Sequence, residues 1–464
     1  MQNFNHIKSV FFIGIGGIGM SALARYFHAE GKLVGGYDKT RSPVTHSLEQ
    51  LGIEIVYNDH PNQVPEVFSN MEYTLIVFTP AVPKGHQALR WFQETGFTVK
   101  KRAEVLGILT RDKTCLAVAG THGKTTTSSL LGHLLAESDV PVTAFLGGIA
   151  ENYQSNLIQK GNEVIVVEAD EFDRSFLQLH PDIACITSMD ADHLDIYGEA
   201  EKLQEGFRAF AQLLTGNKTL ITLPGVNLDG ITAGYEDASA YSAKNVKIVD
   251  GQYHFDLKHP AGMIEGLQLL LPGKHNVLNA VTAMAMALEY FKDEKSSAET
   301  EEKLRTALAS FSGVHRRFSY RIKRNDLVLI DDYAHHPTEI NAVHQAVREM
   351  YPDDKILVVF QPHLFSRTRD FMDDFAKSLA QFDELLLLDI YPAREEPIDG
   401  ITSYAILEQI NAASESSESF SRKRVDSFKE LPEAIKKSKA RIKVLLGAGD
   451  IGEQVEKIIN YLNG

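Results

Sequence analysis

Short apolar runs alternate with amphipathic stretches along most of the chain. Runs rich in β-branched side chains are typical of buried strands, and apolar residues at helical spacing indicate helices. In the first hundred residues or so, the pattern predicts strands over 9–14, 32–37, 54–57 and 73–78, and helices over 20–30, 45–51 and 102–110. Strands that alternate with helices predict a parallel sheet with crossover connections.

A second region with the same alternation begins near residue 110. We expect strands over 114–119, 163–168 and 183–188, and helices over 125–137 and 277–290. Between 218 and 272 the pattern changes to short β-like pieces, such as 246–249 and 251–256, punctuated by Gly and Asp. These pieces predict an antiparallel excursion on the second domain.

A third alternating region fills the rest of the chain. The charged segment 292–303 resembles a linker, but Leu304, Leu308 and Phe311 have helical spacing and predict a helix that continues from it. We therefore place the last boundary at 312–318, with Gly313 as the break. The expected strands are 327–331, 356–360, 384–389 and 443–446, and the serine-rich 413–421 is expected to be a solvated connection. The expected domains are 1–109, 110–312 and 313–464.

Length and composition agree with this division. At roughly 150 residues per domain, 464 residues suggest about three domains. Apolar residues make up 44% and charged residues 23%, which excludes wholesale disorder. The net charge is 47 − 62 = −15, which makes general binding to nucleic acid or to an anionic membrane unfavourable without a local basic patch.

Cysteine usage and the N-terminus bear on the compartment. Cys115 and Cys185 each lie in an apolar, strand-like run, which favours buried thiols in a reducing compartment over a disulfide scaffold. The first residues lack a basic region followed by an apolar stretch, and no apolar run is long enough to span a membrane. We therefore expect a cytoplasmic protein.

The first candidate binding motif is Gly14-Ile15-Gly16-Gly17-Ile18-Gly19, between an expected strand and an expected helix. Its G-x-G-x-x-G spacing lets the backbone approach a diphosphate at a helix N-terminus. Asp38 follows Gly19 by 38 − 19 = 19 positions, where a ribose-binding acid would lie. By itself the motif indicates a nucleotide site, NAD being the obvious reading, or a tight turn that binds nothing.

The second motif is Gly120-Thr121-His122-Gly123-Lys124-Thr125-Thr126-Thr127, again between strand and helix. Successive backbone N–H groups in such a turn bind phosphate, Lys124 would reach the terminal phosphates, and the Thr125 hydroxyl would bind Mg²⁺. The common P-loop pattern has Gly where Val118 stands, so only the shorter G-T-x-G-K-T form is present. The motif favours a nucleoside triphosphate and opposes a simple dehydrogenase.

Two acidic segments follow expected strands: Glu168-Ala169-Asp170-Glu171 and Asp190-Ala191-Asp192-His193-Leu194-Asp195. Mg²⁺ prefers oxygen ligands and keeps several waters, so one or two carboxylates near a triphosphate suffice. Glu168 closes a strand, where such a ligand belongs, whereas His193 is a less usual ligand for a hard cation. Either segment alone favours an acidic surface turn, and the neighbouring Lys124 loop favours the metal reading.

Two segments of the third domain place polar side chains at strand ends: Asp331–Glu339 and Gln361–Asp370. They carry His, Arg, Tyr and Asp, as expected for the walls of one cleft. Zinc at His335, His336 and His363 is disfavoured, because adjacent histidines rarely share a metal and no cysteine joins them. Arg367 and Arg369 would suit a carboxylate bound bidentately, or they are surface charges.

The chain ends with a second G-x-G-x-x-G, Gly447–Gly452. At the last strand–helix turn of a third domain, we favour loop support over another dinucleotide site.

Taken in order, these segments resemble the Mur ligase family, the ATP-dependent amide ligases of peptidoglycan synthesis. Gly120–Thr127 resembles the family's G-T-x-G-K-T-T loop, Lys274-His275-Asn276 its nucleotide-binding His-Asn motif, and His315-Arg316-Arg317-Phe318 its hinge arginine. The resemblance covers nearly the whole chain. It implies an α/β fold of three domains: a Rossmann-like N-terminal domain, a central P-loop ATPase-type domain with a parallel sheet, and a Rossmann-like C-terminal domain.

Within the family, Gly14–Ser21, Asp331–Ile340 and Gln361–Asp370 resemble members that join L-alanine to the lactyl carboxylate of UDP-N-acetylmuramate through an acyl phosphate. This implies a UDP-sugar, not NAD, at the first motif. Residues implied to bind it are Gly14, Gly16, Gly17, Gly19, Met20, Ser21, Asp38 and Arg102. Many such members have Arg where this chain has Leu364, so either Arg367 does more here or the pocket differs in detail.

The resemblance also implies the remaining roles. ATP would be bound by Gly120, Thr121, His122, Gly123, Lys124, Thr125, Thr126, Asn276, Arg316 and Asp332. Two Mg²⁺ ions would be held by Thr125, Glu168 and His193. L-Alanine would be bound by Tyr333, His335, His363 and Arg367. Catalysis would depend on Lys124, His193, His335 and Arg367, with His335 or His363 accepting the amine proton.

Three other functions stay open from the sequence. A recycling ligase that reattaches tripeptide to UDP-N-acetylmuramate shares much of the pattern, but it is not expected to carry the Gln361–Thr368 segment. A nicotinamide dehydrogenase leaves Lys124 and the third domain unexplained. An ATP-gated UDP-sugar sensor without chemistry is disfavoured by the retained Lys124, Glu168, His193 and Arg367.

Overall fold

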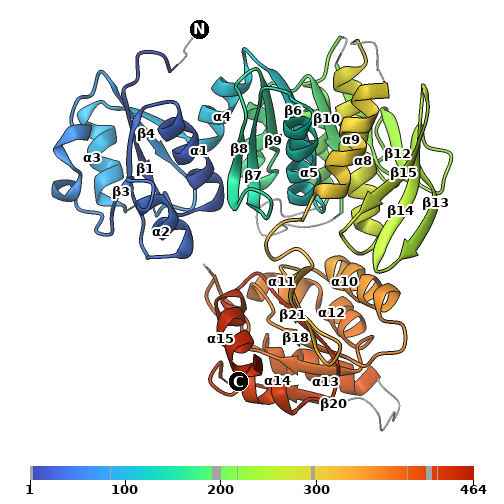
Figure 1. Ribbon diagram of the computed structural model, residues 1–464. Coiled ribbons are helices and arrows are strands. Elements are labelled where there is room, and N and C mark those ends of the chain that lie inside the picture. The colour runs from blue at the N-terminus through green and yellow to red at the C-terminus, as the bar shows by residue number, and fades with distance from the viewer. Residues whose placement is uncertain are drawn as a thin grey trace. The chain divides into compact units, whose positions relative to one another are not determined.

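The computed structural model describes residues 4–83, 85–190, 200–216, 218–293, 298–393, 395–413, 421–425 and 427–463. The chain forms two compact units. The first comprises residues 1–246, 255–268 and 278–312, and the second comprises 247–254, 269–277 and 313–464. Three β-sheets with flanking helices build these units (Figure 1).

The first sheet is fully parallel and has the order β3-β2-β1-β4-β5. Its strands are β1 (Ser9–Ile13), β2 (Leu33–Tyr37), β3 (Glu54–Val56), β4 (Thr74–Phe78) and β5 (Thr98–Lys101). Its helices are α1 (Ile18–Ala29), α2 (Pro43–Glu49), α3 (Gln87–Thr95), α4 (Arg102–Thr110), η1 (Pro61–Gln63) and η2 (Glu66–Phe68). The strand order reverses between β1 and β4, and ligands of open α/β sheets bind at the carboxyl ends of such neighbours.

Side chains of β1 alternate between two apolar layers. Val10 and Phe12 pack with residues of α1, whereas Phe11 packs with Phe92 of α3. This alternation follows from the two-residue period of a strand. The layer on the α1 side continues into the second sheet, because α1 contacts β7 (Val142–Ala150) and β8 (Ser155–Gln159).

The second sheet has ten strands in the order β15-β14-β13-β12-β11-β10-β6-β9-β7-β8. Besides β7 and β8 they are β6 (Thr114–Ala119), β9 (Val164–Glu168), β10 (Ile183–Ile186), β11 (Thr219–Thr222), β12 (Ile231–Tyr235), β13 (Tyr241–Val249), β14 (Gln252–His259) and β15 (Gly262–Leu269). The helices are α5 (Lys124–Glu137), η3 (Phe172–Gln178), α7 (Ala200–Ala211), α8 (Lys274–Phe291) and α9 (Ala298–Ser310). Strand β6 lies between β10 and β9, so the loop that follows it leaves from inside the sheet.

The predicted antiparallel excursion over 218–272 is wrong in its first half. Strand β11 pairs parallel with β10, β12 with β11, and β13 with β12. Strands β13, β14 and β15 are neighbours in the sheet and are joined by the two-residue turns 250–251 and 260–261, which are connections typical of antiparallel hairpins. Gly and Asp in the connections mark turns but do not fix the direction of the next strand. Strand β8 also pairs antiparallel with β7, so this sheet is mixed.

The third sheet has the order β16-β17-β21-β18-β19-β20 and is parallel except for the edge strand β16. Its strands are β16 (Ser319–Lys323), β17 (Val328–Asp332), β18 (Ile356–Phe360), β19 (Glu384–Leu387), β20 (Ser421–Arg424) and β21 (Ile442–Leu446). The helices are α10 (Pro337–Met350), α11 (Phe365–Asp370), α12 (Met372–Leu379), α13 (Ser403–Ala413), α14 (Leu431–Lys437) and α15 (Ile451–Asn463). Separate apolar clusters cover the two faces of the sheet, with α10, α12 and α13 on one and α14 and α15 on the other.

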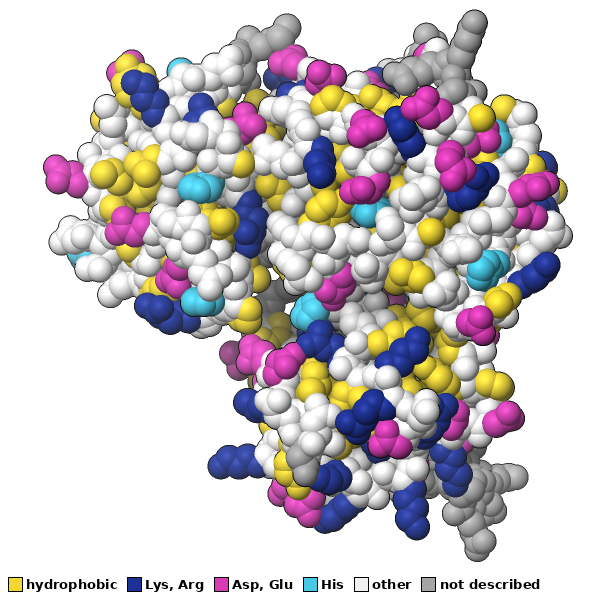
Figure 2. All heavy atoms as spheres, in the orientation of Figure 1, with side chains coloured by type: hydrophobic (Ala, Val, Ile, Leu, Met, Phe, Trp, Pro, Cys, Tyr) yellow, Lys and Arg dark blue, Asp and Glu magenta, His cyan; other side chains and the backbone are white. Residues whose placement is uncertain are grey.

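The three-domain α/β architecture is confirmed. Cys115 and Cys185 are buried and free, and α9 carries Leu304 and Leu308 as expected. Most of the serine-rich 413–421 lies outside the described residues. Within the described part of the chain, no helix is both long enough and apolar enough to cross a membrane. Acidic and basic side chains are interspersed on the face shown in Figure 2.

Candidate functional site

The Gly120–Thr127 segment forms a tight turn between β6 and α5. Gly123 precedes the helix with φ of 82°, and a Cβ there would lie 2.7 Å from Oδ1 of Asn279, so both backbone and space require glycine. His122 N donates to Ser188 Oγ at 2.9 Å, which ties the turn to the end of the neighbouring strand β10. The turn therefore leads directly into a helix N-terminus, the arrangement that binds phosphate.

The side chain of Lys124 is held by its own loop. Its Nζ donates to the carbonyl oxygens of Gly120 at 2.6 Å and Thr121 at 3.2 Å, and to Oε1 of the fully buried Glu171 at 2.9 Å. Burial lowers the pKa of Lys124, but nearby carboxylates, Glu171 first, outweigh it and hold that pKa above its usual value. Burial raises the pKa of Glu171, an effect that the Lys124 ammonium only partly offsets.

Oxygen ligands for a divalent cation lie beside this loop. Thr125 is in the first turn of α5, and Glu168 is the last residue of β9, which neighbours β6. Glu168 Oε2 accepts a hydrogen bond from Gly147 N at 3.1 Å. A hydroxyl and a carboxylate beside a phosphate loop fit Mg²⁺, which needs few protein ligands. The predicted ligand His193 lies outside the described residues.

Part of the first glycine motif lines a pocket of about 290 Å³ in the first unit. The lining residues are Gly17, Ile18, Gly19, Met20, Ala22, Thr79, Ala81, Arg102, Leu106, Phe145, Leu146, Gly147, Glu168 and Asp170. Arg102 forms an ion pair with Asp170, with Nη2 and Oδ2 3.2 Å apart, and lies so close to Gly19 that a Cβ there would be 2.7 Å from Nη1. The pocket thus joins the first motif to the metal candidate Glu168.

Other predicted UDP-sugar residues shape the turn instead of lining this pocket. Asp38 accepts hydrogen bonds from Gly16 N at 2.7 Å and Thr40 N at 3.2 Å. The buried Ser21 hydroxyl donates to Ile18 O and accepts from Nδ2 of Asn156, on β8, at 2.8 Å. Gly14 N donates to the carbonyl of Tyr37 at 2.8 Å. Gly14, Gly16, Ser21 and Asp38 therefore fix the backbone that the pocket residues depend on.

In the second unit, the four residues predicted for the amino-acid pocket lie together. The His335 ring contacts the rings of Tyr333 and His363, with centroids 5.3 Å and 5.7 Å apart. Arg367, only 6% exposed, donates from Nη1 to Nδ1 of His363 at 3.3 Å. His335 Nδ1 donates to the carbonyl of Tyr333 at 3.0 Å and lies 3.1 Å from Oε2 of Glu339. The cluster combines a cation, two imidazoles and a phenol.

The predicted ATP-binding residues of the second unit are also firmly held. Arg316 has φ of 59°, a left-handed conformation that is costly outside glycine. Its Nε donates to Oδ1 of Asp331 at 3.3 Å. Asp332 accepts hydrogen bonds from Phe318 N and Ala334 N at 2.6 Å and 2.7 Å. Burial raises the pKa of Asp332 to about 6.

The Lys274-His275-Asn276 segment opens α8. Asn276 Nδ2 donates to the carbonyl of Pro272 at 2.6 Å, which fixes the start of the helix. Burial, with a smaller contribution from Arg317, lowers the pKa of His275 to about 4, so this imidazole is neutral near pH 7.

Three further residues named in the sequence analysis have other positions: His336, Arg369 and Leu364. His336 caps α10, its Nδ1 accepting from Thr338 N at 3.3 Å, and packs on Phe371, so it does not join His335 and His363. Among the described residues no group of three or more His, Cys, Asp or Glu side chains could hold a metal. Arg369 is exposed and donates to Asp370 at 2.7 Å. Leu364 is buried.

Sequence reasoning missed several residues that hold the site. Glu171 was grouped with the acidic segment but not connected to Lys124. Asn279 accepts a hydrogen bond from Thr127 at 3.3 Å, and its position one helical turn after Asn276 could have indicated that it faces the same side. Glu339 accepts a hydrogen bond from His335 N at 2.9 Å, and its spacing of four residues from His335 could have indicated this contact.

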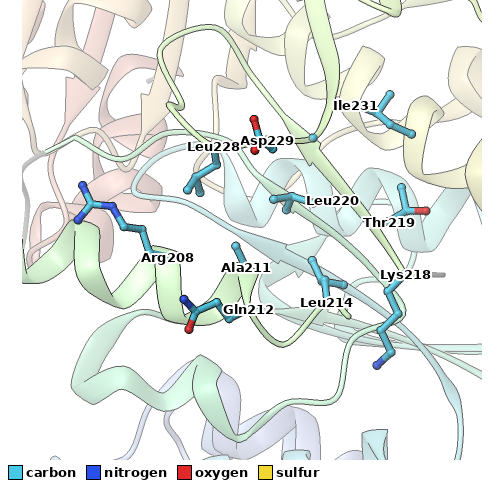
Figure 3. A pocket seen from close by; sticks show the side chains of 11 residues that line it. Arg208, Ala211, Gln212, Leu214, Lys218, Thr219, Leu220, Leu228, Asp229 and Ile231 are labelled. Carbon is cyan, nitrogen blue, oxygen red and sulfur yellow. The ribbon is translucent and has the colours of Figure 1, made fainter. Parts of the chain in front are cut away.

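A second hollow of about 670 Å³ lies between the end of α7 and the strands β11 and β12 (Figure 3). It is lined by Arg208, Ala211, Gln212, Leu214, Lys218, Thr219, Leu220, Leu228, Asp229, Gly230 and Ile231. None of the residues predicted from the motifs lines it.

Comparison with protein families gives three successive matches along the chain. Residues 9–114 match the profile described as "Mur ligase family, catalytic domain", residues 118–287 the "Mur ligase middle domain", and residues 316–451 the "Mur ligase, glutamate ligase domain".

Whole-length relatives and solved structures agree with these matches. The chain is 56% identical over 459 residues to the UDP-N-acetylmuramate–L-alanine ligase of Christiangramia forsetii, covering 99% of this chain and 98% of that protein. It is 56% identical over 462 residues to the ligase of that name from Flavobacterium psychrophilum, covering all of both. The crystal structure of the Thermotoga maritima UDP-N-acetylmuramate–alanine ligase aligns with a TM-score of 0.81 at 27% identity, covering 98% and 99% of the two chains. A murein peptide ligase from Psychrobacter arcticus, at 21% identity and a TM-score of 0.68, shares the fold.

Proposed function

The chain belongs to the Mur ligase family, and we propose from this premise that it joins L-alanine to the lactyl carboxylate of UDP-N-acetylmuramate at the expense of ATP. The observation that carries the proposal is the 56% identity, over 99% of the chain, to a ligase named for that reaction. The product enters peptidoglycan precursor synthesis, and we expect the enzyme to act in the cytoplasm.

Two steps make the amide bond. The lactyl carboxylate attacks the γ-phosphorus of ATP, giving an acyl phosphate and ADP. The neutral amine of L-alanine then attacks the acyl carbon, and the tetrahedral intermediate expels inorganic phosphate. Both steps bring negative oxygens together, so cationic groups must neutralise them.

Lys124 and the N-terminus of α5 are suited to bind the ATP phosphates. The three hydrogen bonds of Lys124 Nζ are made within the loop and to Glu171, so binding requires the ammonium to exchange at least one of them for a phosphate oxygen. Thr125 and Glu168 would hold Mg²⁺, which would screen charge on the phosphates. We propose that His193 contributes to a second Mg²⁺ near the substrate carboxylate, and that Asn276, Arg316 and Asp332 bind ATP.

The UDP-sugar would occupy the pocket lined by Gly17, Gly19, Met20 and Arg102. Glu168 lines that same pocket, which would bring the lactyl carboxylate of the sugar towards the metal and the γ-phosphate. Asp38 supports this arrangement indirectly, since its carboxylate fixes the Gly16 amide.

L-Alanine would bind in the cluster of Tyr333, His335, His363 and Arg367, with its carboxylate paired to Arg367. The hydrogen bonds favour His335 as the group that accepts the amine proton. Its Nδ1 is committed to the Tyr333 carbonyl, which leaves Nε2 as the acceptor, whereas His363 Nδ1 is engaged by Arg367.

The deciding experiment measures phosphate release with ATP, Mg²⁺ and UDP-N-acetylmuramate against a panel of amino acids and the recycled tripeptide. We expect turnover with L-alanine, weaker turnover with glycine or serine, and none with the tripeptide. Turnover with the tripeptide alone would identify the recycling ligase, and no ATP turnover would identify a sensor. Lys124→Ala should abolish phosphate release while UDP-sugar binding, measured by calorimetry, persists.

The assignment of the base has its own test. His335→Gln should lower kcat by about 10²–10⁴-fold, as loss of a general base does. His363→Gln should chiefly raise KM for L-alanine, because it removes a partner of Arg367. The reverse pattern would move the proton acceptor to His363.

A further inference from the structure

The second glycine-rich segment, Gly447–Gly452, leaves β21 between the two strand ends that carry the amino-acid pocket. Strand β21 lies between β17 and β18 in the sheet. In both pairings Leu446 is the last partner, opposite Asp332 of β17 and Phe360 of β18. The turn that follows Leu446 therefore emerges between the Asp331–Glu339 and Gln361–Asp370 segments.

One side of the turn holds Arg316. The guanidinium Nη2 donates to the carbonyl of Gly447 at 2.5 Å, while Nε is paired with Asp331. A Cβ at Gly452 would overlap the guanidinium, so this glycine is needed for the close approach. Because Arg316 has a left-handed backbone, contacts of this kind are needed to keep it in place.

The other side of the turn holds Gln361. Its Nε2 donates to Oδ1 of Asp450 at 2.6 Å, and its Oε1 accepts from Ile451 N at 3.0 Å. The backbone of Gly447, with φ of 147°, lies so near that a Cβ there would be 2.8 Å from the Gln361 carbonyl. A Cβ at Gly449 would lie 2.5 Å from Gln361 Oε1. The Gln361 side chain is 4% exposed, and both ends of its amide are used.

The loop beyond Gln361 is continuous with this anchor. Leu364, with φ of 71°, donates from its N to the carbonyl of Tyr391 at 2.9 Å, and Tyr391 N donates to the carbonyl of Pro362 at 2.8 Å. The ring of His363 stacks on Tyr391 with centroids 5.7 Å apart and an angle of 20°. Tyr391 in turn packs on Gly449, where a Cβ would lie 2.7 Å from its Cβ. His363 is thus connected to the turn in two ways: along the chain from Gln361, and through its stacking on Tyr391.

We propose that the Gly447–Gly452 turn is a shared anchor that aligns Arg316 and the His363 loop, and that Gln361 and Asp450 are positioning residues for the amino-acid pocket. This use of the motif needs no dinucleotide. The proposal rests on the function proposed above, in which Arg316 serves ATP and His363 serves L-alanine.

A reversed hydrogen bond tests the Gln361 side of the anchor. Gln361→Glu replaces the donor to Asp450 with a carboxylate and sets two like charges together. In the double variant Gln361→Glu with Asp450→Asn, the new amide can donate to the new carboxylate, whose other oxygen still accepts from Ile451 N. We expect the single variant to raise KM for L-alanine at least tenfold with KM for ATP within twofold. The double variant should return KM for L-alanine to within threefold of the wild type.

Gly452→Ala tests the Arg316 side. The added methyl displaces the guanidinium, so we expect KM for ATP to rise at least fivefold while KM for L-alanine stays within twofold. Glu453→Ala, at the exposed next residue, is the matched control and should change neither constant. A general loss of folding would instead lower the apparent kcat and leave both KM values unchanged, because it only reduces the amount of active enzyme.

Three results would overturn the proposal: an unchanged KM for L-alanine in Gln361→Glu, equal changes in both KM values, or a folded double variant that is not restored. If the wild type uses another amino acid, the proposed function fails and the same comparison is made with that substrate. If the wild type shows no turnover, amide hydrogen exchange of residues 361–366 decides. Exchange should be faster in Gln361→Glu and return to the wild-type rate in the double variant. Equal exchange rates in all three proteins would overturn the proposal that the turn anchors this loop.

Discussion

At the scale of single residues, Arg367 offers the most direct test of the amino-acid pocket. It is buried and donates to His363, and we assign it the carboxylate of L-alanine. Arg367→Ala should raise KM for L-alanine about 10- to 150-fold, the equivalent of the roughly 1.5–3 kcal/mol of a hydrogen bond to a charged group. Arg369→Ala, two positions on and exposed, is the control. A rise confined to KM for ATP would move Arg367 out of this pocket.

Glu171 permits a second test at this scale. It is fully buried and supplies the counter-charge of Lys124. Glu171→Gln keeps an oxygen that can accept from Lys124 Nζ but removes the negative charge, so it should cost about 3 kcal/mol of stability, as breaking a buried pair does. ATP phosphates would replace the lost counter-charge, so a non-hydrolysable ATP analogue with Mg²⁺ should raise Tm more in this variant than in wild type.

The control for this comparison is Glu163→Gln, because Glu163 is exposed directly before β9. Equal ligand-induced shifts of Tm in Glu171→Gln and wild type would show that Glu171 does not restrain Lys124.

Residue types and order predicted which side chains lie together in the candidate site better than they predicted its hydrogen bonds. The Lys124 loop and the Tyr333, His335, His363 and Arg367 cluster follow from motifs at strand ends. The contact of Asp38 with Gly16 N, by contrast, depends on how two loops fold back, which no spacing encodes. The contact between Lys124 and Glu171 could not be predicted for the same reason, since the two residues follow different strands.

At the scale of elements, strands with uniform apolar runs were well predicted, and β6 and β18 match to the residue. Strand β7 was missed because Gly147 and Gly148 interrupt its pattern, and Gly147 is glycine to leave room for the Glu168 carboxylate. The direction of β12 and β13 was also missed, because pairing is decided by the neighbouring strand and not by the turn residues alone.

The end of α14 carries a prediction about pH. Lys443, on β21, is 4% exposed and donates from Nζ to the carbonyls of Ile435 at 2.9 Å and Ser438 at 3.0 Å, which caps the helix. Burial lowers its pKa to about 8 from an ordinary 10.5, with Glu384 opposing the shift. Between these values the unfolded chain binds more protons than the folded one, so the free energy of unfolding should rise with pH.

Urea unfolding between pH 8 and 10 measures this effect. We expect the difference in unfolding free energy between wild type and Lys443→Met to increase with pH by at most about 1.4 kcal/mol per unit. The variant removes the titrating group without removing the apolar stem, so the other groups cancel in the difference. Parallel pH curves for the two proteins would show that Lys443 titrates as it does in water.

At the scale of the whole molecule, the proposed reaction draws on both compact units. Lys124 and Glu168 belong to the first unit, and Arg316 and Arg367 belong to the second. With the proposed residue roles, groups of both units bind the substrates, and the acyl phosphate must be protected from water until the amine attacks. We therefore predict that the units close around the ligands.

Small-angle scattering tests this closure. We expect the radius of gyration to fall when UDP-N-acetylmuramate and a non-hydrolysable ATP analogue with Mg²⁺ are both present, and to fall less with either alone. The Lys124→Ala variant should lose the part of the response that depends on the ATP analogue, because the phosphates then lack their main cation in the first unit. An unchanged radius at saturating concentrations of both ligands would mean that the units need not approach each other for binding, and that protection of the acyl phosphate must come from residues around it within a single unit.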